Sequence, residues 1–64
     1  MRVVIQRING ETIIYKCAYE VFGRGKHDEK FVVIYPNELD HNVEAEMEYN
    51  TDTIDSVVIT FTGE

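Results

Sequence analysis

The chain has 64 residues, of which 44% are hydrophobic, and a formal charge of −6. This size predicts a single domain over residues 1–64, and the hydrophobic content excludes an intrinsically disordered chain. One cysteine excludes an internal disulfide, no signal peptide is recognised, and the longest apolar run, residues 31–35, is too short to cross a bilayer. We therefore expect an intracellular, cytoplasmic protein without a membrane span.

The charge is divided unevenly along the chain. Residues 1–30 hold all six basic residues and four acidic ones, whereas residues 31–64 hold eight acidic residues and no Lys or Arg. Opposite electrostatic fields are expected from the two halves unless the fold interleaves them.

The chain opens with a predicted β-hairpin. Two β-rich runs, residues 2–8 and 12–19, flank Asn9-Gly10, a pair that favours a type I′ turn. Period-2 alternation then predicts one core-facing set in the second run, namely Ile13, Tyr15, Cys17 and Tyr19.

Residues 22–30, FGRGKHDEK, contain two glycines and five charged residues, which predicts a mobile, solvated loop. Glycines beside Arg24 and Lys26 also suit an anion-binding loop, but the Walker spacing is missing and an ordinary hairpin loop is favoured. Residues 31–35 follow as an unbroken apolar run, typical of a central strand covered on both faces and ended by Pro36.

In residues 42–50, NVEAEMEYN, the hydrophobic period and the intrinsic helix propensity predict different structures. A helix near residues 38–49 would bury Leu39, Val43 and Met47, but it would stack like charges at Asp40, Glu44 and Glu48. Strict alternation of apolar residues with glutamates favours a strand instead, entered through a turn at residues 40–42.

Residues 56–62 alternate again and predict a last strand with a threonine-bearing outer face. The fold expected is all-β, a small antiparallel barrel or curled sheet of about five strands. The alternative is an α+β fold with a four-stranded antiparallel sheet and one helix near residues 38–49.

A row of carboxylates is the most informative surface feature. Three glutamates at alternate positions share one face of the predicted strand, where they form either a solvated outer surface or a docking surface for a basic protein. The absence of Lys and Arg after Lys30 favours docking, because a surface made for solubility mixes both signs. The predicted partner-binding residues are Glu44, Glu46, Glu48, Asp40, Asp52 and Asp55.

No metal site or cofactor is expected. A calcium loop starting at Asp40 fails because Ala45 stands where Gly is needed and Thr51 where a bidentate Glu is needed. Enzymatic activity is not expected either, because Cys17 is predicted to be buried in a strand, where a thiol is inert, and so small a chain leaves little room for a pocket.

Two rival functions remain open. The first is a nucleic-acid-binding barrel that uses Arg2, Arg7, Lys16, Arg24 and Lys26, with Tyr15 as a stacking platform, although the net charge disfavours direct nucleic-acid binding. The second is a self-associating subunit, a homodimer through a strand edge. The leading hypothesis is a small, non-enzymatic acidic binding module, inhibitor or regulator, whose partner is a basic protein such as one that binds nucleic acid.

Overall fold

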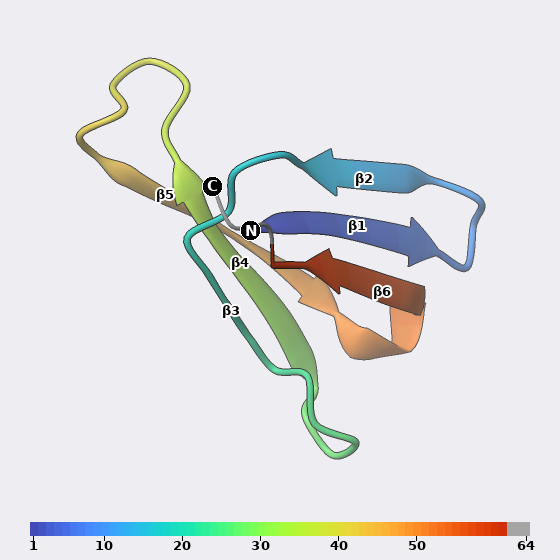
Figure 1. The fold of residues 1–64 in the computed structure, drawn as a ribbon. Helices are drawn as coiled ribbons and strands as arrows, with labels where there is room; N and C mark the ends of the chain where they lie inside the picture. Colours follow the sequence, from blue (N-terminus) through green and yellow to red (C-terminus); the bar gives the residue numbers. More distant parts are fainter. Residues whose placement is uncertain (62–64) are drawn as a thin grey trace.

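The computed structural model describes residues 1–61 and is all-β (Figure 1). Its elements are β1 (Arg2–Arg7), β2 (Thr12–Tyr15), β3 (Glu20–Phe22), β4 (Lys30–Pro36), β5 (Glu44–Asn50), the 3-10 helix η1 (Thr51–Thr53) and β6 (Ile54–Thr60). They form two antiparallel sheets, sheet A in the order β2-β1-β6 and sheet B in the order β3-β4-β5. The all-β prediction is confirmed, and the alternative with a helix near residues 38–49 is wrong. The prediction of five strands in a barrel or curled sheet is confirmed only in part, because the described residues form six strands in two sheets that do not close into a barrel.

The predicted hairpin joins β1 to β2, but its turn is of another type. The Gly10 N–H donates to the Arg7 carbonyl at 3.0 Å, and the Arg7 N–H donates to the Glu11 carbonyl at 2.9 Å. Gly10 has a φ of +94°. A type I′ turn would also require a positive φ at Asn9, and Asn9 does not have one. The loop is therefore a type I turn closed by a left-handed glycine. The Asn9 side chain stabilises it by accepting the Glu11 N–H at 2.9 Å.

The predicted strand over residues 12–19 is interrupted after Tyr15. The Ala18 N–H donates to the carbonyl of Met1, next to sheet A, and the Tyr19 N–H donates to the carbonyl of Ile34 in sheet B, both at 2.8 Å. The chain thus changes sheets within this segment. As a result Ala18 is buried, whereas Cys17 and Tyr19 are exposed, so the prediction that Cys17 and Tyr19 face the core is wrong.

In sheet B, β4 is the central strand, as predicted, and pairs with β3 and β5. The expectation that both of its faces are covered is wrong. Phe31 and Val33 are buried against the core, whereas Val32 and Ile34 are half-buried on the outer side of the sheet. In residues 1–61 no further strand or helix is stacked on that side as a third layer.

The strand predicted from the alternating glutamates is β5, and the predicted turn precedes it. The Val43 N–H donates to the Asp40 carbonyl at 3.0 Å, which closes that turn. The last strand, β6, begins two residues earlier than predicted, and the predicted end at Thr62 lies outside the described residues.

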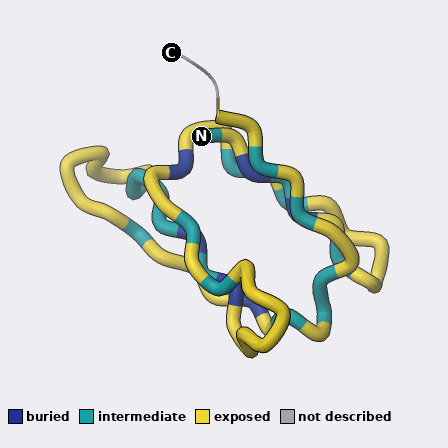
Figure 2. The backbone as a smooth tube through the Cα atoms, turned by 60° about the horizontal axis from the view of Figure 1, so that its bottom comes forward, coloured by how far each residue is buried: buried dark blue, intermediate teal, exposed yellow. Residues whose placement is uncertain are grey.

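The core lies between the two sheets. Both contribute to one buried cluster, which consists of Val3, Ile5, Ala18, Phe31, Val33 and Tyr49 (Figure 2). A core of this size leaves much of each sheet's outer face to solvent. The described part of the chain contains no helix that is long and apolar enough to cross a membrane.

Candidate functional site

The outer face of sheet B combines apolar and acidic side chains. The β4–β5 register sets Glu44 beside Pro36, Glu46 beside Ile34, and Glu48 beside Val32. On the other side of β4, Glu20 lies opposite Ile34 and Phe22 opposite Val32. We call this surface the acid-rimmed face: its centre is Phe22, Val32, Ile34 and Pro36, and its rim is Glu20, Glu44, Glu46 and Glu48.

The rim glutamates are all exposed, and a shallow hollow of about 380 Å³ lies among Ile34, Glu44, Ala45 and Glu46. Lys30 is the one basic residue of sheet B in the described chain, and it lies at the end of β4, where its ammonium donates to the Asn50 Oδ1 at 2.7 Å. The centre of the face is therefore apolar, and the charge around it is negative except at Lys30.

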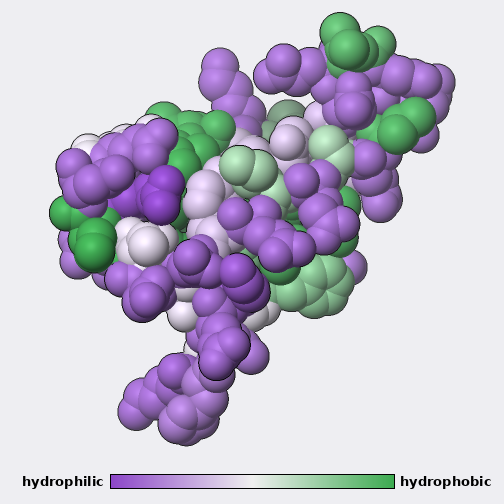
Figure 3. All heavy atoms as spheres, turned by 180° about the vertical axis from the view of Figure 1, so that it is seen from behind, coloured by the Kyte–Doolittle hydropathy of each residue, from purple (hydrophilic) through white to green (hydrophobic). Residues whose placement is uncertain are grey.

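The β4–β5 loop extends this surface beyond the sheet. It projects from the body of the molecule with hydrophobic groups among hydrophilic ones (Figure 3). Leu39 is 98% exposed at its tip, between Glu38 and Asp40, and Val43 is 50% exposed. The sequence did not predict Leu39 and Glu38 as part of this surface. A signal for Leu39 was present, because a large aliphatic residue next to a predicted turn has no strand to pack on.

This loop is tied internally by hydrogen bonds. The Asn37 Oδ1 accepts the N–H groups of Leu39 at 2.8 Å and Asp40 at 3.3 Å, and the Asp40 Oδ1 accepts the Asn42 N–H at 3.0 Å. The Asn37 N–H donates in turn to the Val43 carbonyl at 3.0 Å. Leu39 is therefore presented to solvent on a loop with a defined conformation.

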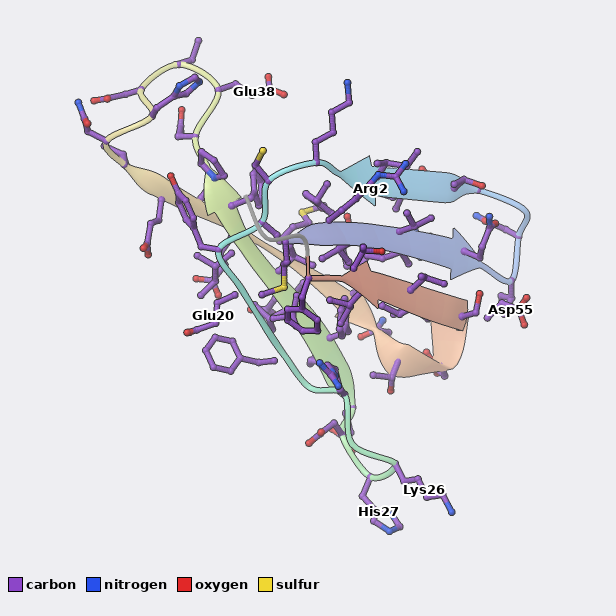
Figure 4. The ribbon with its side chains drawn as sticks, in the orientation of Figure 1. Arg2, Glu20, Lys26, His27, Glu38 and Asp55 are labelled. Carbon is purple, nitrogen blue, oxygen red and sulfur yellow. The ribbon has the colours of Figure 1, made fainter. Side chains whose placement is uncertain are left out.

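Four of the six predicted acidic residues come together on this side of the molecule, and two do not. Glu44, Glu46 and Glu48 lie on the acid-rimmed face and Asp40 on its loop, whereas Asp52 is in η1 and Asp55 is in β6 of sheet A. In Figure 4, Glu20 and Glu38 lie near the strands and loop of sheet B, far from Asp55. Among residues 1–61 no three His, Cys, Asp or Glu side chains form a group that could hold a metal ion.

The basic residues of the rival hypothesis are divided among three places. Arg2 and Lys16 lie at one end of sheet A, and Arg24 and Lys26 lie in the β3–β4 loop, with Lys26 at its tip (Figure 4). The side chain of Arg7 lies over the ring of Tyr49, 5.7 Å from its centroid. These cations do not share one surface.

Arg7 is held on the inner side of the molecule. Its Nη1 donates to Glu11 Oε1 and its Nη2 to Thr53 Oγ1, both at 3.2 Å. Its Nε is buried and has no partner among the described residues. Because three elements meet at this guanidinium, its contacts join β1 to η1 and β5.

Tyr15, the predicted stacking platform, belongs to the same junction. Its hydroxyl hydrogen-bonds to that of Tyr49, and its ring centroid lies 5.0 Å from that of Tyr35. Burial raises the pKa of the Tyr15 hydroxyl far above its ordinary value, and the hydrogen bond to Tyr49 adds to this effect. The three tyrosines come from β2, β4 and β5 and tie sheet A to sheet B.

A second hollow, of about 410 Å³, lies between β6 and the β3–β4 loop. Its walls are largely apolar and include Phe31, Ile54 and Val57, and Arg24 is its one charged lining residue in residues 1–61. Gly23 at its edge has a φ of +82°, and a Cβ there would lie 1.8 Å from the Lys30 carbonyl oxygen. Its lining within residues 1–61 has no pair of titratable groups suited to acid–base chemistry.

No protein-family model, curated protein or solved structure matches this chain. The residues themselves therefore carry the functional interpretation.

Proposed function

We propose that this protein is a non-enzymatic binding module, of the inhibitor or regulator kind, that docks its acid-rimmed face on a basic surface of a partner protein. The β4–β5 loop contributes Leu39 as an apolar anchor, and Glu38 and Asp40 extend the acidic rim.

The observation that carries this proposal is the apolar outer side of β4, on which no strand or helix of residues 1–61 is stacked. Val32 and Ile34 stand in the middle of a three-stranded sheet, and glutamates occupy the neighbouring positions. Specific protein interfaces commonly have an apolar centre surrounded by a polar rim, because the centre supplies most of the binding energy and the rim supplies specificity. A face made only for solvation would not need aliphatic residues at its centre.

The loop supports the same proposal. Exposed aliphatic side chains bind best when they are already held in position, since less conformational entropy is lost on association. The hydrogen bonds of Asn37 and Asp40 restrict the loop that carries Leu39. An anchor of this kind fits a small apolar pocket on the partner.

The charges define the chemistry of the partner. The surface it offers carries lysine or arginine side chains around an apolar patch, as a nucleic-acid-binding protein can. Carboxylates on alternate residues of one strand are about 6.6 Å apart, a spacing that separate basic side chains can match. Complementary charge speeds association and rejects acidic competitors.

The test is a comparative pull-down from source-cell lysate, eluted along a salt gradient. The bait is the wild type or the variant E44Q/E46Q/E48Q, and the matched control D28N/E29Q/D52N removes the same charge outside the acid-rimmed face. We expect the first variant to weaken retention of a basic protein by at least about tenfold and the control by less than about threefold. Leu39→Ser is expected to weaken retention of the same protein by about thirtyfold, as at an interface hot spot.

Folding is checked separately by denaturant unfolding. Because all substituted glutamates and aspartates are exposed, both triple variants should keep the free energy of unfolding within about 0.5 kcal/mol of the wild type. Equal losses of retention with the two triple variants would show that only the net charge of the protein matters. Unchanged retention with Leu39→Ser would show that the β4–β5 loop is not part of the interface.

A further inference from the structure

The outer face of sheet A has a different composition from the acid-rimmed face. The register aligns Ile14, Val4 and Val58 in one row across its three strands. Ile14 is 48% and Val58 57% exposed, and Val4 between them is half-buried. The next row towards the hairpin turn is neutral and polar and contains Thr12, Gln6 and Ser56. We call this surface the neutral face.

The charges at the two ends of the neutral face have opposite signs. Arg2 pairs with Thr60 at one end, and Lys16 follows the end of β2 beside it. At the other end a β-bulge between Gln6 and Arg7 places an extra residue, Asp55, in β6. Ile54 and Val57 line the inner groove, so Asp55 and Ser56 share the outer side.

We propose that the neutral face binds a second copy of this chain, with a two-fold axis that lies in the interface and runs along the row of Ile14, Val4 and Val58. This axis places each member of the row on its own counterpart. It also reverses the strand direction, so that the Arg2 and Lys16 end of one copy lies over the Asp55 end of the other.

Charge selects this arrangement over the alternatives. A two-fold axis along the strands would place the Arg2 ends of the two copies over each other and the Asp55 ends over each other, which like-charge repulsion opposes. The acid-rimmed face is equally unsuited to self-pairing, because its glutamates would meet glutamates. Among the outer faces of the two sheets, only the neutral face is complementary to itself.

The pairing has a consequence for the proposed function without depending on it. Sheet B remains free in both copies, so the dimer presents two acid-rimmed faces. A partner with two basic sites would then be bound with an avidity above that of a single contact.

The experiment is sedimentation equilibrium of the purified chain from micromolar to millimolar concentration, at fixed salt. The variants are R2E, D55K, the double exchange R2E/D55K, and V58D, with E46Q as a control on the acid-rimmed face. Because each contact occurs twice in a two-fold dimer, we expect R2E and D55K each to raise the dimer Kd by about tenfold. The double exchange restores the contact with reversed polarity, so its Kd should return to within about threefold of the wild type, as should that of E46Q.

The net charge separates this proposal from a general repulsion effect. D55K makes the chain less negative, so general repulsion predicts tighter association, whereas the proposed contact predicts weaker association. V58D should raise the Kd by at least about a hundredfold, since each dimer would bury two unpaired carboxylates. A monomeric wild type, a tighter D55K dimer or a V58D dimer of unchanged Kd would overturn the proposal. If V58D does not fold, the charge variants alone decide the proposal.

Discussion

The outer faces of the two sheets share an architecture and differ in chemistry. Each is a surface of three antiparallel strands with aliphatic side chains at its centre, Val32 and Ile34 in sheet B and Val4 in sheet A. The outer positions of β5 are Glu44, Glu46, Glu48 and Asn50, whereas those of β6 are Asp55, Ser56, Val58 and Thr60. The apolar centres make both faces suitable for association, and the surrounding charges determine which partner each accepts.

The first prediction compares the two sides of sheet B, and its effect is the largest. Phe31→Ala removes a fully buried ring and should lower the free energy of unfolding by about 3–5 kcal/mol. Phe22 is 50% exposed on the acid-rimmed face, so Phe22→Ala should cost less than about 1 kcal/mol. Denaturant unfolding measures both. A comparable loss from Phe22→Ala would mean that the outer face serves folding rather than binding.

The second prediction compares the glycine turns that serve each sheet. Gly23→Ala puts a Cβ 1.8 Å from the Lys30 carbonyl oxygen at a positive φ, and it should cost more than about 2 kcal/mol. Gly10 also has a positive φ, but a Cβ added there meets no atom within 4 Å, so Gly10→Ala should lower the free energy of unfolding by about 1 kcal/mol. Thermal unfolding of the two variants in one buffer gives the difference. Equal costs would show that the backbone at Gly23 relaxes away from the clash.

The third prediction concerns the tyrosine junction between the sheets. Tyr15→Phe removes the hydrogen bond to Tyr49 and should cost about 1–2 kcal/mol near neutral pH. The folded protein holds the pKa of Tyr15 above its ordinary value of 10.0, so the unfolded chain releases this proton first as pH rises. The stabilisation is therefore fully present below about pH 10 and is lost at higher pH.

Unfolding measured on both sides of the ordinary tyrosine pKa tests this linkage. The wild type should lose stability with rising pH more steeply than Tyr15→Phe, which lacks the group. Exposed Tyr19 provides the control, because Tyr19→Phe should keep the steep loss of the wild type. Parallel pH profiles for the wild type and Tyr15→Phe would contradict the role assigned to the junction.

Local patterns predicted the strands well where turn residues and period-2 alternation agreed. Gly10 marked the β1–β2 hairpin, and the glutamates at alternate positions outweighed the helical propensity of residues 43–49 to give β5. Both features are local, since a strand exposes every second side chain to the same side. The type of the first turn was missed because Asn9-Gly10 also fits a type I turn with Gly10 in the left-handed position.

The break after Tyr15 was not predictable from the same patterns. Alternation continues through Cys17 and Tyr19, yet the backbone there pairs first with Met1 and then with Ile34. The choice of pairing partners depends on how the two sheets meet, a long-range feature that no short window of sequence contains. The wrong placement of Cys17 and Tyr19 follows from that single break.

The order of the amino acids is enough to show which residues alternate, where the charges lie along the chain, and that β4 has apolar residues on both sides. Three features depend on how the strands assemble: no further element of residues 1–61 is stacked on one side of β4, Asp52 and Asp55 lie apart from Glu44, Glu46 and Glu48, and Glu20 joins the rim. Period-2 alternation assigns a side chain to a face of its strand, whereas the packing of distant segments selects which face is covered.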